Sequence, residues 1–266
     1  MILKYKKETI SIITMLAVLA IVFSSLFIYT GNWPPAVIVE SSSMQHGNNF
    51  VFGVINTGDI VAVKKVSSFT DVQTYLLARE RGFPSNYGEF GNVIVYKNYV
   101  LRELVIHRAI FYVEGWSGTT PILYGNNNPS WLSIQGSNVY ITDVGYTHQN
   151  LEVKLQNVIG QEGFVTMGDN NFANRIGGVD GNYTIAADQD TGIDYGSLVN
   201  TTQVVGYAVG YLPVFGVLKL WVTGQTEYIP QASNEIMVIL IIVIIALIFV
   251  PIPSFRSKKS SDKEKS

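Results

Sequence analysis

The chain has 266 residues, of which 47% are hydrophobic and only 14% are charged, and its formal net charge is −2. This length allows one sizeable domain with additional segments, and the small net charge provides no basic field that would attract nucleic acid. The chain contains no cysteine, which excludes disulfide bonds, thiolate nucleophiles and cysteine-based zinc sites. Because its three histidines are His46, His107 and His148, a mechanism that needs an imidazole base must use one of them.

An uncharged apolar run near the N-terminus predicts a membrane-spanning helix over residues 10–30. About 20 apolar residues suffice for a helix to cross the hydrocarbon core of a bilayer. A cleavable signal peptide is the alternative, but its apolar core would be shorter and a site with small residues should follow it. Residues 30–34 form a poor site of that kind, so we expect a retained anchor.

A second apolar run predicts another membrane-spanning helix, over residues 235–253. Its centre, residues 237–245, is too continuously apolar for an amphipathic surface helix. Basic residues lie on the outer side of both runs, within residues 1–9 and within the tail of residues 254–266. The positive-inside tendency therefore predicts that both termini are cytoplasmic, in a multi-pass protein of the cell membrane. Residues 31–234 would then form one extracytoplasmic domain.

The segment 31–234 carries patterns typical of β-strands. After the short strand-like run at 36–39, segments rich in β-branched and aromatic residues are bounded by glycine and asparagine; they are residues 59–63, 92–96, 104–113, 138–142, 163–167 and 203–209. One helix is expected, from Thr70 to Arg81. The predicted fold class is mainly β, an antiparallel β domain with one N-terminal and one C-terminal transmembrane helix. Glycosylation triplets at Asn182 and Asn200 agree with this topology.

Three features of the predicted β domain could together support acyl transfer by a serine. Three consecutive serines precede Met44, His107 lies on an apolar strand, and Asp169 lies in a Gly-Asp-Asn-Asn turn. Each also fits an ordinary turn or a structural histidine. Together they supply a weak nucleophile, a base with a pKa of about 6.5 and a carboxylate to orient that base.

Six short segments, in chain order, resemble the sequence boxes of type I signal peptidases; they are residues 41–44, 57–63, 91–96, 105–110, 164–171 and 204–216. Bacterial members carry lysine before the arginine of the fourth box, whereas archaeal and endoplasmic-reticulum members carry histidine. Because His107 precedes Arg108 here, the chain resembles the archaeal and endoplasmic-reticulum branch.

The resemblance implies a signal-peptidase-like fold and a membrane-bound serine endopeptidase that removes N-terminal signal peptides from exported preproteins. It implies Ser43 as the nucleophile and His107 as the general base. The Ser43 backbone N–H and the Ser41 hydroxyl would hold the oxyanion. The partners implied are preproteins with signal peptides and the lipid bilayer, with the protein-export translocon as a further candidate. No metal or cofactor is expected.

The third member of the catalytic group is left open by the sequence. In the family branch, a second aspartate shortly after the Gly-Asp-Asn-Asn box orients the base, and the first supports it, which is the role of Asp169 here. Asp180 is the nearest candidate for the second aspartate, and Asp188 is its rival. Two further departures from the pattern are Ser42, which replaces glycine and could need an unusual φ, and His46, an alternative base close to Ser43.

Other functions remain to be weighed against this one. The chain could be a catalytically inactive, double-anchored extracytoplasmic binding or scaffold domain, which the altered spacing after Asn171 and the residue at Ser42 would favour. A lysine-dependent protease using Lys64 or Lys65 is disfavoured because neither follows the matching strand. Sortase-like transpeptidation lacks its cysteine.

Overall fold

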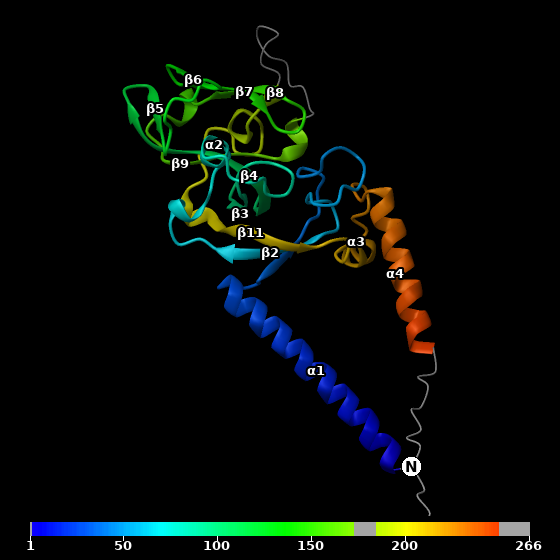
Figure 1. Ribbon diagram of the computed structural model, residues 1–266. Helices are drawn as coiled ribbons and strands as arrows, with labels where there is room; N and C mark the ends of the chain where they lie inside the picture. The colour runs from blue at the N-terminus through cyan, green and yellow to red at the C-terminus, as the bar shows by residue number, and fades with distance from the viewer. Residues whose placement is uncertain (1, 173–184, 250–266) are drawn as a thin grey trace, which may run out of the picture.

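The computed structural model describes residues 2–172 and 185–249, and it contains a mainly antiparallel β domain with a long helix at each end (Figure 1). The prediction of a mainly antiparallel β fold is therefore confirmed. Asp180, the first glycosylation triplet and the predicted basic tail lie outside the described residues.

The N-terminal helix α1 (Ile2–Thr30) projects away from the β domain (Figure 1). Its part from Thr9 to Thr30 has 22 residues, is not buried and is long and apolar enough to cross a membrane. The helix ends at Gly31, whose φ of 63° lies in the left-handed region and whose N–H donates to the Phe27 carbonyl oxygen at 2.8 Å. Glycine adopts this C-terminal capping geometry without the penalty of a Cβ atom.

The C-terminal helix α4 (Gln231–Phe249) is also apolar, but its apolar part, Gln231–Leu247, is shorter than α1's candidate span. The span predicted over residues 235–253 therefore begins inside α4 and extends beyond the residues that the structure describes. The short helix α3 (Val217–Thr223) lies beside α4 and packs against it (Figure 1).

The main sheet has seven strands, and all neighbouring pairs are antiparallel. Its order is β1 (Ala36–Ile38), β2 (Ile60–Lys65), β11 (Val204–Leu212), β3 (Val93–Asn98), β4 (Glu103–Ser117) and β5 (Thr120–Leu123), with β9 (Gly163–Met167) also pairing with β4. The strands predicted from the sequence correspond to β1, β2, β3, β4, β9 and β11. Strand β1 is an edge strand, paired only with β2 among the described strands.

A second sheet covers one side of the main sheet (Figure 1). Its order is β10 (Ile185–Ala186), β8 (Gln149–Lys154), β7 (Asn138–Val144) and β6 (Leu132–Gln135), and β10 runs parallel to β8. Of these four strands only β7 was predicted, and the segment between the strands predicted at 104–113 and 138–142 contains β5 and β6. Phe111 and Val165 of the main sheet and Ile141 and Leu151 of the second sheet share one buried core. The two sheets are thus layers of one domain.

The helix predicted from Thr70 to Arg81 is wrong in its extent. The structure has a 3-10 turn at Phe69–Asp71 and a separate helix α2 at Tyr75–Glu80. Each has its own cap: the Ser68 side chain accepts a hydrogen bond from the Thr70 backbone, and the Thr74 side chain accepts one from the Leu77 backbone. Between them Val72 is extended, so the capping residues divide the apolar pattern into two elements.

Candidate active site

A cleft of about 770 Å³ runs between β1 and the hairpin formed by β3 and β4. Ser41, Ser43 and His107 line it, together with charged side chains at Glu40, Glu103 and Lys219. The remaining walls are mainly apolar, and they include Val37, Ile38, Leu101, Leu104, Val105 and Ile193. The cleft therefore brings together two of the side chains that the sequence singled out for chemistry.

His107 is held by the buried carboxylate of Asp188. It lies on β4 and is 2% exposed, and its Nδ1 is 2.6 Å from Oδ2 of Asp188. Because an ionised carboxylate only accepts hydrogen bonds, Nδ1 is the donor, which leaves Nε2 as the acceptor in the neutral ring. Burial by itself lowers the pKa of His107, but the surrounding carboxylates, Asp188 first and then Asp194 and Asp169, together outweigh burial, so the pKa is raised above its ordinary value. Asp188 thus stabilises the imidazolium form.

Gly168 lies between Ser43 and His107, and because it has no side chain both residues can approach it closely. A Cβ atom at Gly168 would lie 3.0 Å from Nε2 of His107, 3.1 Å from Cβ of Ser43 and only 2.6 Å from the Ser43 carbonyl oxygen. Both side chains therefore crowd the same glycine at the end of β9. The loop that carries Ser43 is fixed there because the Asn170 N–H donates to the Ser43 carbonyl oxygen at 2.8 Å.

The loop after β1 that contains Ser41, Ser42, Ser43 and His46 (the serine loop) holds the hydroxyls of Ser41 and Ser43 close together. Oγ of Ser41 and Oγ of Ser43 are 3.2 Å apart and form a hydrogen bond. The Thr57 hydroxyl donates to the Ser41 carbonyl oxygen at 2.8 Å, which ties the loop to the turn before β2. Ser42 is not among the non-glycine residues with positive φ, so the loop accommodates this side chain without the unusual backbone considered from the sequence.

Asp169 is buried in an ion pair with Arg108, the residue after His107. Nε and Nη2 of Arg108 donate to the two carboxylate oxygens of Asp169 at 2.7 and 2.6 Å. Nη1 of Arg108 donates to four backbone carbonyl oxygens, those of Asn86, Glu89, Phe90 and Gly91. Burial raises the pKa of Asp169, but the Arg108 guanidinium and, after it, His46 together outweigh burial, so the pKa is lowered. The pair joins β4 to the turn that follows β9.

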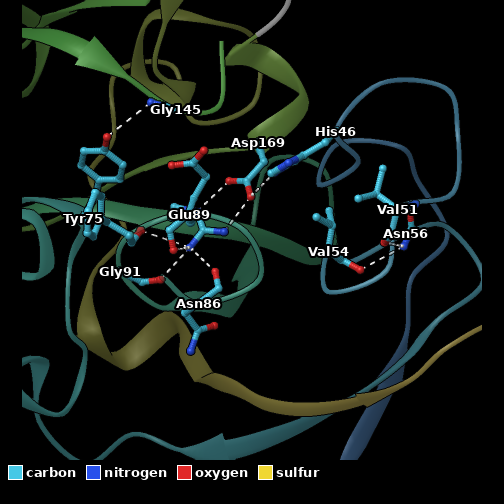
Figure 2. Close-up of polar contacts among 12 residues, drawn as sticks. His46, Val51, Val54, Asn56, Tyr75, Asn86, Glu89, Gly91, Gly145 and Asp169 are labelled. Atoms are coloured by element: carbon cyan, nitrogen blue, oxygen red, sulfur yellow. Dashed lines mark hydrogen bonds and ion pairs between the residues drawn. The ribbon is translucent and has the colours of Figure 1, made fainter. Parts of the chain in front are cut away.

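His46 also turns toward Asp169 (Figure 2). Its Nε2 is 3.3 Å from Oδ2 of Asp169, and its ring stacks on Tyr146 with 4.0 Å between ring centroids. Among the described residues, the structure gives His46 no hydrogen bond to Ser43. The alternative in which His46 is the base is therefore not supported by this geometry, and His46 anchors the serine loop instead.

The structure separates the residues that the sequence left as alternatives. Asp188 contacts His107, Asp169 contacts Arg108, and Asp180 lies outside the described part of the chain. Neither Lys64 nor Lys65 lines the cleft. His148 is exposed and pairs with Asp143.

Some site residues were missed by sequence reasoning. Thr166 donates its hydroxyl to Oδ2 of Asp188 at 2.7 Å, and its position as the one polar residue within the buried strand β9 was an available signal. Lys219 of α3 forms an ion pair with Glu40 at the cleft. Its partner lies on a distant segment, so no local pattern could have identified that pair.

No protein-family model matches the chain, and no curated protein matches it either. The geometry and chemistry of the cleft are therefore the basis for a functional proposal.

Asp169→Asn should lower the free energy of unfolding by about 3 kcal/mol, because Arg108 would remain buried without its counter-charge. Asp143→Asn is the matched control, since Asp143 is exposed and 3.7 Å from Arg79, and its effect should stay under about 1 kcal/mol. Denaturant unfolding in detergent micelles measures both variants. Equal effects of the two substitutions would contradict the structural role given to the buried pair.

Proposed function

We propose that the chain is a membrane-bound serine endopeptidase that removes N-terminal signal peptides from exported preproteins. The observation that carries this proposal is the convergence of Ser43 and the pair His107–Asp188 on Gly168 in one cleft. A hydroxyl, an imidazole and an orienting carboxylate are the parts that serine acyl transfer needs, and they are recognised by geometry rather than by chain order.

In the proposed reaction, Oγ of Ser43 attacks the scissile carbonyl carbon while Nε2 of His107 takes the hydroxyl proton. The Asp188 carboxylate stabilises the imidazolium that forms. The imidazolium then gives its proton to the departing amine, and a water molecule, activated by the neutral imidazole, hydrolyses the acyl-enzyme. The Ser41 hydroxyl and the Ser43 N–H would donate to the oxyanion. Loss of one such donor typically costs about 3 kcal/mol, or roughly 100-fold in rate.

The free edge of β1 supports recognition of an extended peptide. The Val39 N–H donates to the Asp59 carbonyl oxygen, and the Val63 N–H donates to the Pro35 carbonyl oxygen. Because successive residues of a strand direct their backbone groups to opposite sides, the backbone groups of Ala36 and Ile38 point away from β2, and both residues line the cleft. A substrate strand added to this edge would gain backbone hydrogen bonds, and its alternate side chains would contact the apolar walls. Small side chains at the −1 and −3 positions are the expectation from the resemblance.

The position of the cleft relative to α1 supports a membrane-bound substrate. Only β1 and two short connections separate Ser43 from the end of α1. If α1 spans the bilayer, the nucleophile lies close to the membrane surface at which a signal sequence emerges. In the proposed topology α4 continues into a second span, both termini are cytoplasmic and residues 31–234 are extracytoplasmic, as the basic residues outside the two apolar runs favour.

One observation favours the alternative of an inactive, double-anchored binding domain. The hydrogen bond formed by the Ser43 hydroxyl joins it to Ser41 rather than to His107. Catalytic hydrogen bonds are often long or misaligned until substrate binds. Ser43 and His107 already lie against the same residue, Gly168. The active enzyme therefore remains the better-supported proposal.

Ser43→Ala and His107→Ala should each reduce cleavage of a model preprotein by roughly 10³-fold or more, because the triad acts as a unit. Asp188→Asn should cause a large loss, whereas His148→Ala, which changes an exposed histidine, should leave the rate near that of the wild type. The assay is product formation by the chain in lipid vesicles. Cleavage by Ser43→Ala at the wild-type rate would exclude the proposed nucleophile.

The cleavage rate should also depend on pH through His107. Its pKa is raised above the ordinary 6.5, and only the neutral ring accepts the Ser43 proton. The value of kcat/KM should therefore fall on the acid side with a midpoint above pH 6.5. Profiles measured from about pH 5 to 9 for the wild type and Asp188→Asn test this. Because the variant loses the charge that favours imidazolium, its midpoint should be lower, and identical midpoints would contradict the role of Asp188.

A further inference from the structure

We propose that Asp194 is a positioning residue that anchors the loop carrying Asp188 and places a second carboxylate near that of Asp188, which contacts the imidazole of His107. The effect expected on the cleavage rate rests on the proposed function, whereas the effect expected on the pKa of His107 does not. The loop extends from the 3-10 turn at Asp188–Asp190 to Asp194.

The backbone of this loop closes on itself. The N–H groups of Thr191 and Asp194 donate to the Asp188 carbonyl oxygen at 3.2 and 3.1 Å, and the Thr191 hydroxyl donates to the same oxygen at 3.1 Å. Asp188 and Asp194 are therefore the two ends of one compact turn. A contact that fixes Asp194 also restricts where Asp188 can lie.

Strand β3 supplies that contact. Asp194 is 6% exposed, and its two carboxylate oxygens accept hydrogen bonds from the Tyr96 hydroxyl at 2.5 Å and from Nδ2 of Asn98 at 2.8 Å. Both donors lie on β3 and are buried. A buried carboxylate must be held by such donors, because leaving one unpaired costs far more than a typical hydrogen bond contributes. The turn is thus fastened to the strand that pairs with β4.

Thr166 links the two carboxylates. Its hydroxyl donates to Oδ2 of Asp188 at 2.7 Å, and it lies 3.5 Å from Oδ2 of Asp194 and 3.4 Å from the Tyr96 hydroxyl. Within the described part of the chain, Oδ1 of Asp188 has no hydrogen-bond partner. Asp188 is therefore oriented by His107, by Thr166 and by its own turn. A turn that is not anchored would let the Asp188 carboxylate move relative to the imidazole of His107.

The charges in this cluster are coupled. The carboxylates that act on the imidazole of His107 are Asp188 and Asp194 from this turn and Asp169 from the turn after β9. Burial raises the pKa of Asp194, and the nearby Asp188 carboxylate adds to this. The imidazolium of His107 favours ionised Asp194, and ionised Asp194 in turn favours the imidazolium. Removing the Asp194 charge should therefore make His107 easier to deprotonate.

Three variants separate this role from a general effect on folding. Asp194→Asn removes the charge, and Tyr96→Phe removes only one of the two donors that hold the Asp194 carboxylate, because Asn98 remains. Asp190→Asn is the matched control, because Asp190 lies in the same turn and accepts its hydrogen bonds from the Lys154 N–H on β8. Imidazole titrations by NMR of histidine-labelled chain in micelles report on His107 directly, and the signal is assigned by its loss in His107→Gln.

Asp194→Asn should lower the pKa of His107 by roughly half a unit or more, because a nearby negative charge is lost. Tyr96→Phe should shift it in the same direction by less, and Asp190→Asn should leave it unchanged. In the cleavage assay, Asp194→Asn and Tyr96→Phe should lower kcat by roughly 10-fold, with KM within about twofold, as for a group that improves general-base catalysis.

An unchanged pKa of His107 in Asp194→Asn, or a shift equal to that in Asp190→Asn, would overturn the inference. If Asp194→Asn does not fold, Tyr96→Phe decides, and an unchanged pKa there overturns it as well. If the wild-type chain cleaves no preprotein but the pKa of His107 falls in Asp194→Asn, the proposed function fails while the coupling between Asp194 and His107 is supported.

Discussion

The arrangement of the site depends on the buried ion pair between Arg108 and Asp169. Arg108 follows His107 on β4, and Asp169 follows Gly168 after β9, so the pair fixes the end of β9 against the strand that carries His107. Gly168 can then lie against both Ser43 and His107. The same carboxylate is contacted by His46 from the serine loop. One buried charge pair therefore sets the relative positions of three segments that are distant in sequence.

Local patterns were sufficient to predict much of this architecture. Strand β9 and the start of β7 were predicted from runs of β-branched and aromatic residues, and α1 from its uncharged apolar run. The segments around Ser43 and His107 were recognisable because each combines an unusual polar residue with a strand-like neighbourhood. Strands β5 and β6 were missed because they are only four residues long and follow turn-rich sequence, and β10 has two residues.

The partner of His107 could not be predicted from spacing alone. Asp180 is nearer in sequence to the Gly-Asp-Asn-Asn turn, but the hydrogen bond to His107 is made by Asp188, which is brought there by the pairing of β10 with β8 and by the turn that Asp194 closes. Such contacts depend on the tertiary fold. His46 illustrates the same limit, because its proximity to Ser43 in sequence suggested a base, whereas stacking on Tyr146 and the contact with Asp169 direct its ring elsewhere.

We propose that Ser43 is a nucleophile and that His107 acts as its general base. Covalent acylation of Ser43 is the measurement that bears on this proposal. The chain in lipid vesicles is incubated with an activated ester of a short peptide ending in Ala-Ala-Ala. The reaction is then quenched in acid, and the digested chain is analysed by mass spectrometry. We expect an acyl group on the peptide that contains Ser43 in the wild type, none at that peptide in Ser43→Ala and a greatly reduced amount in His107→Ala. Equal acylation of the serine loop in Ser43→Ala, or none in the wild type, would contradict it.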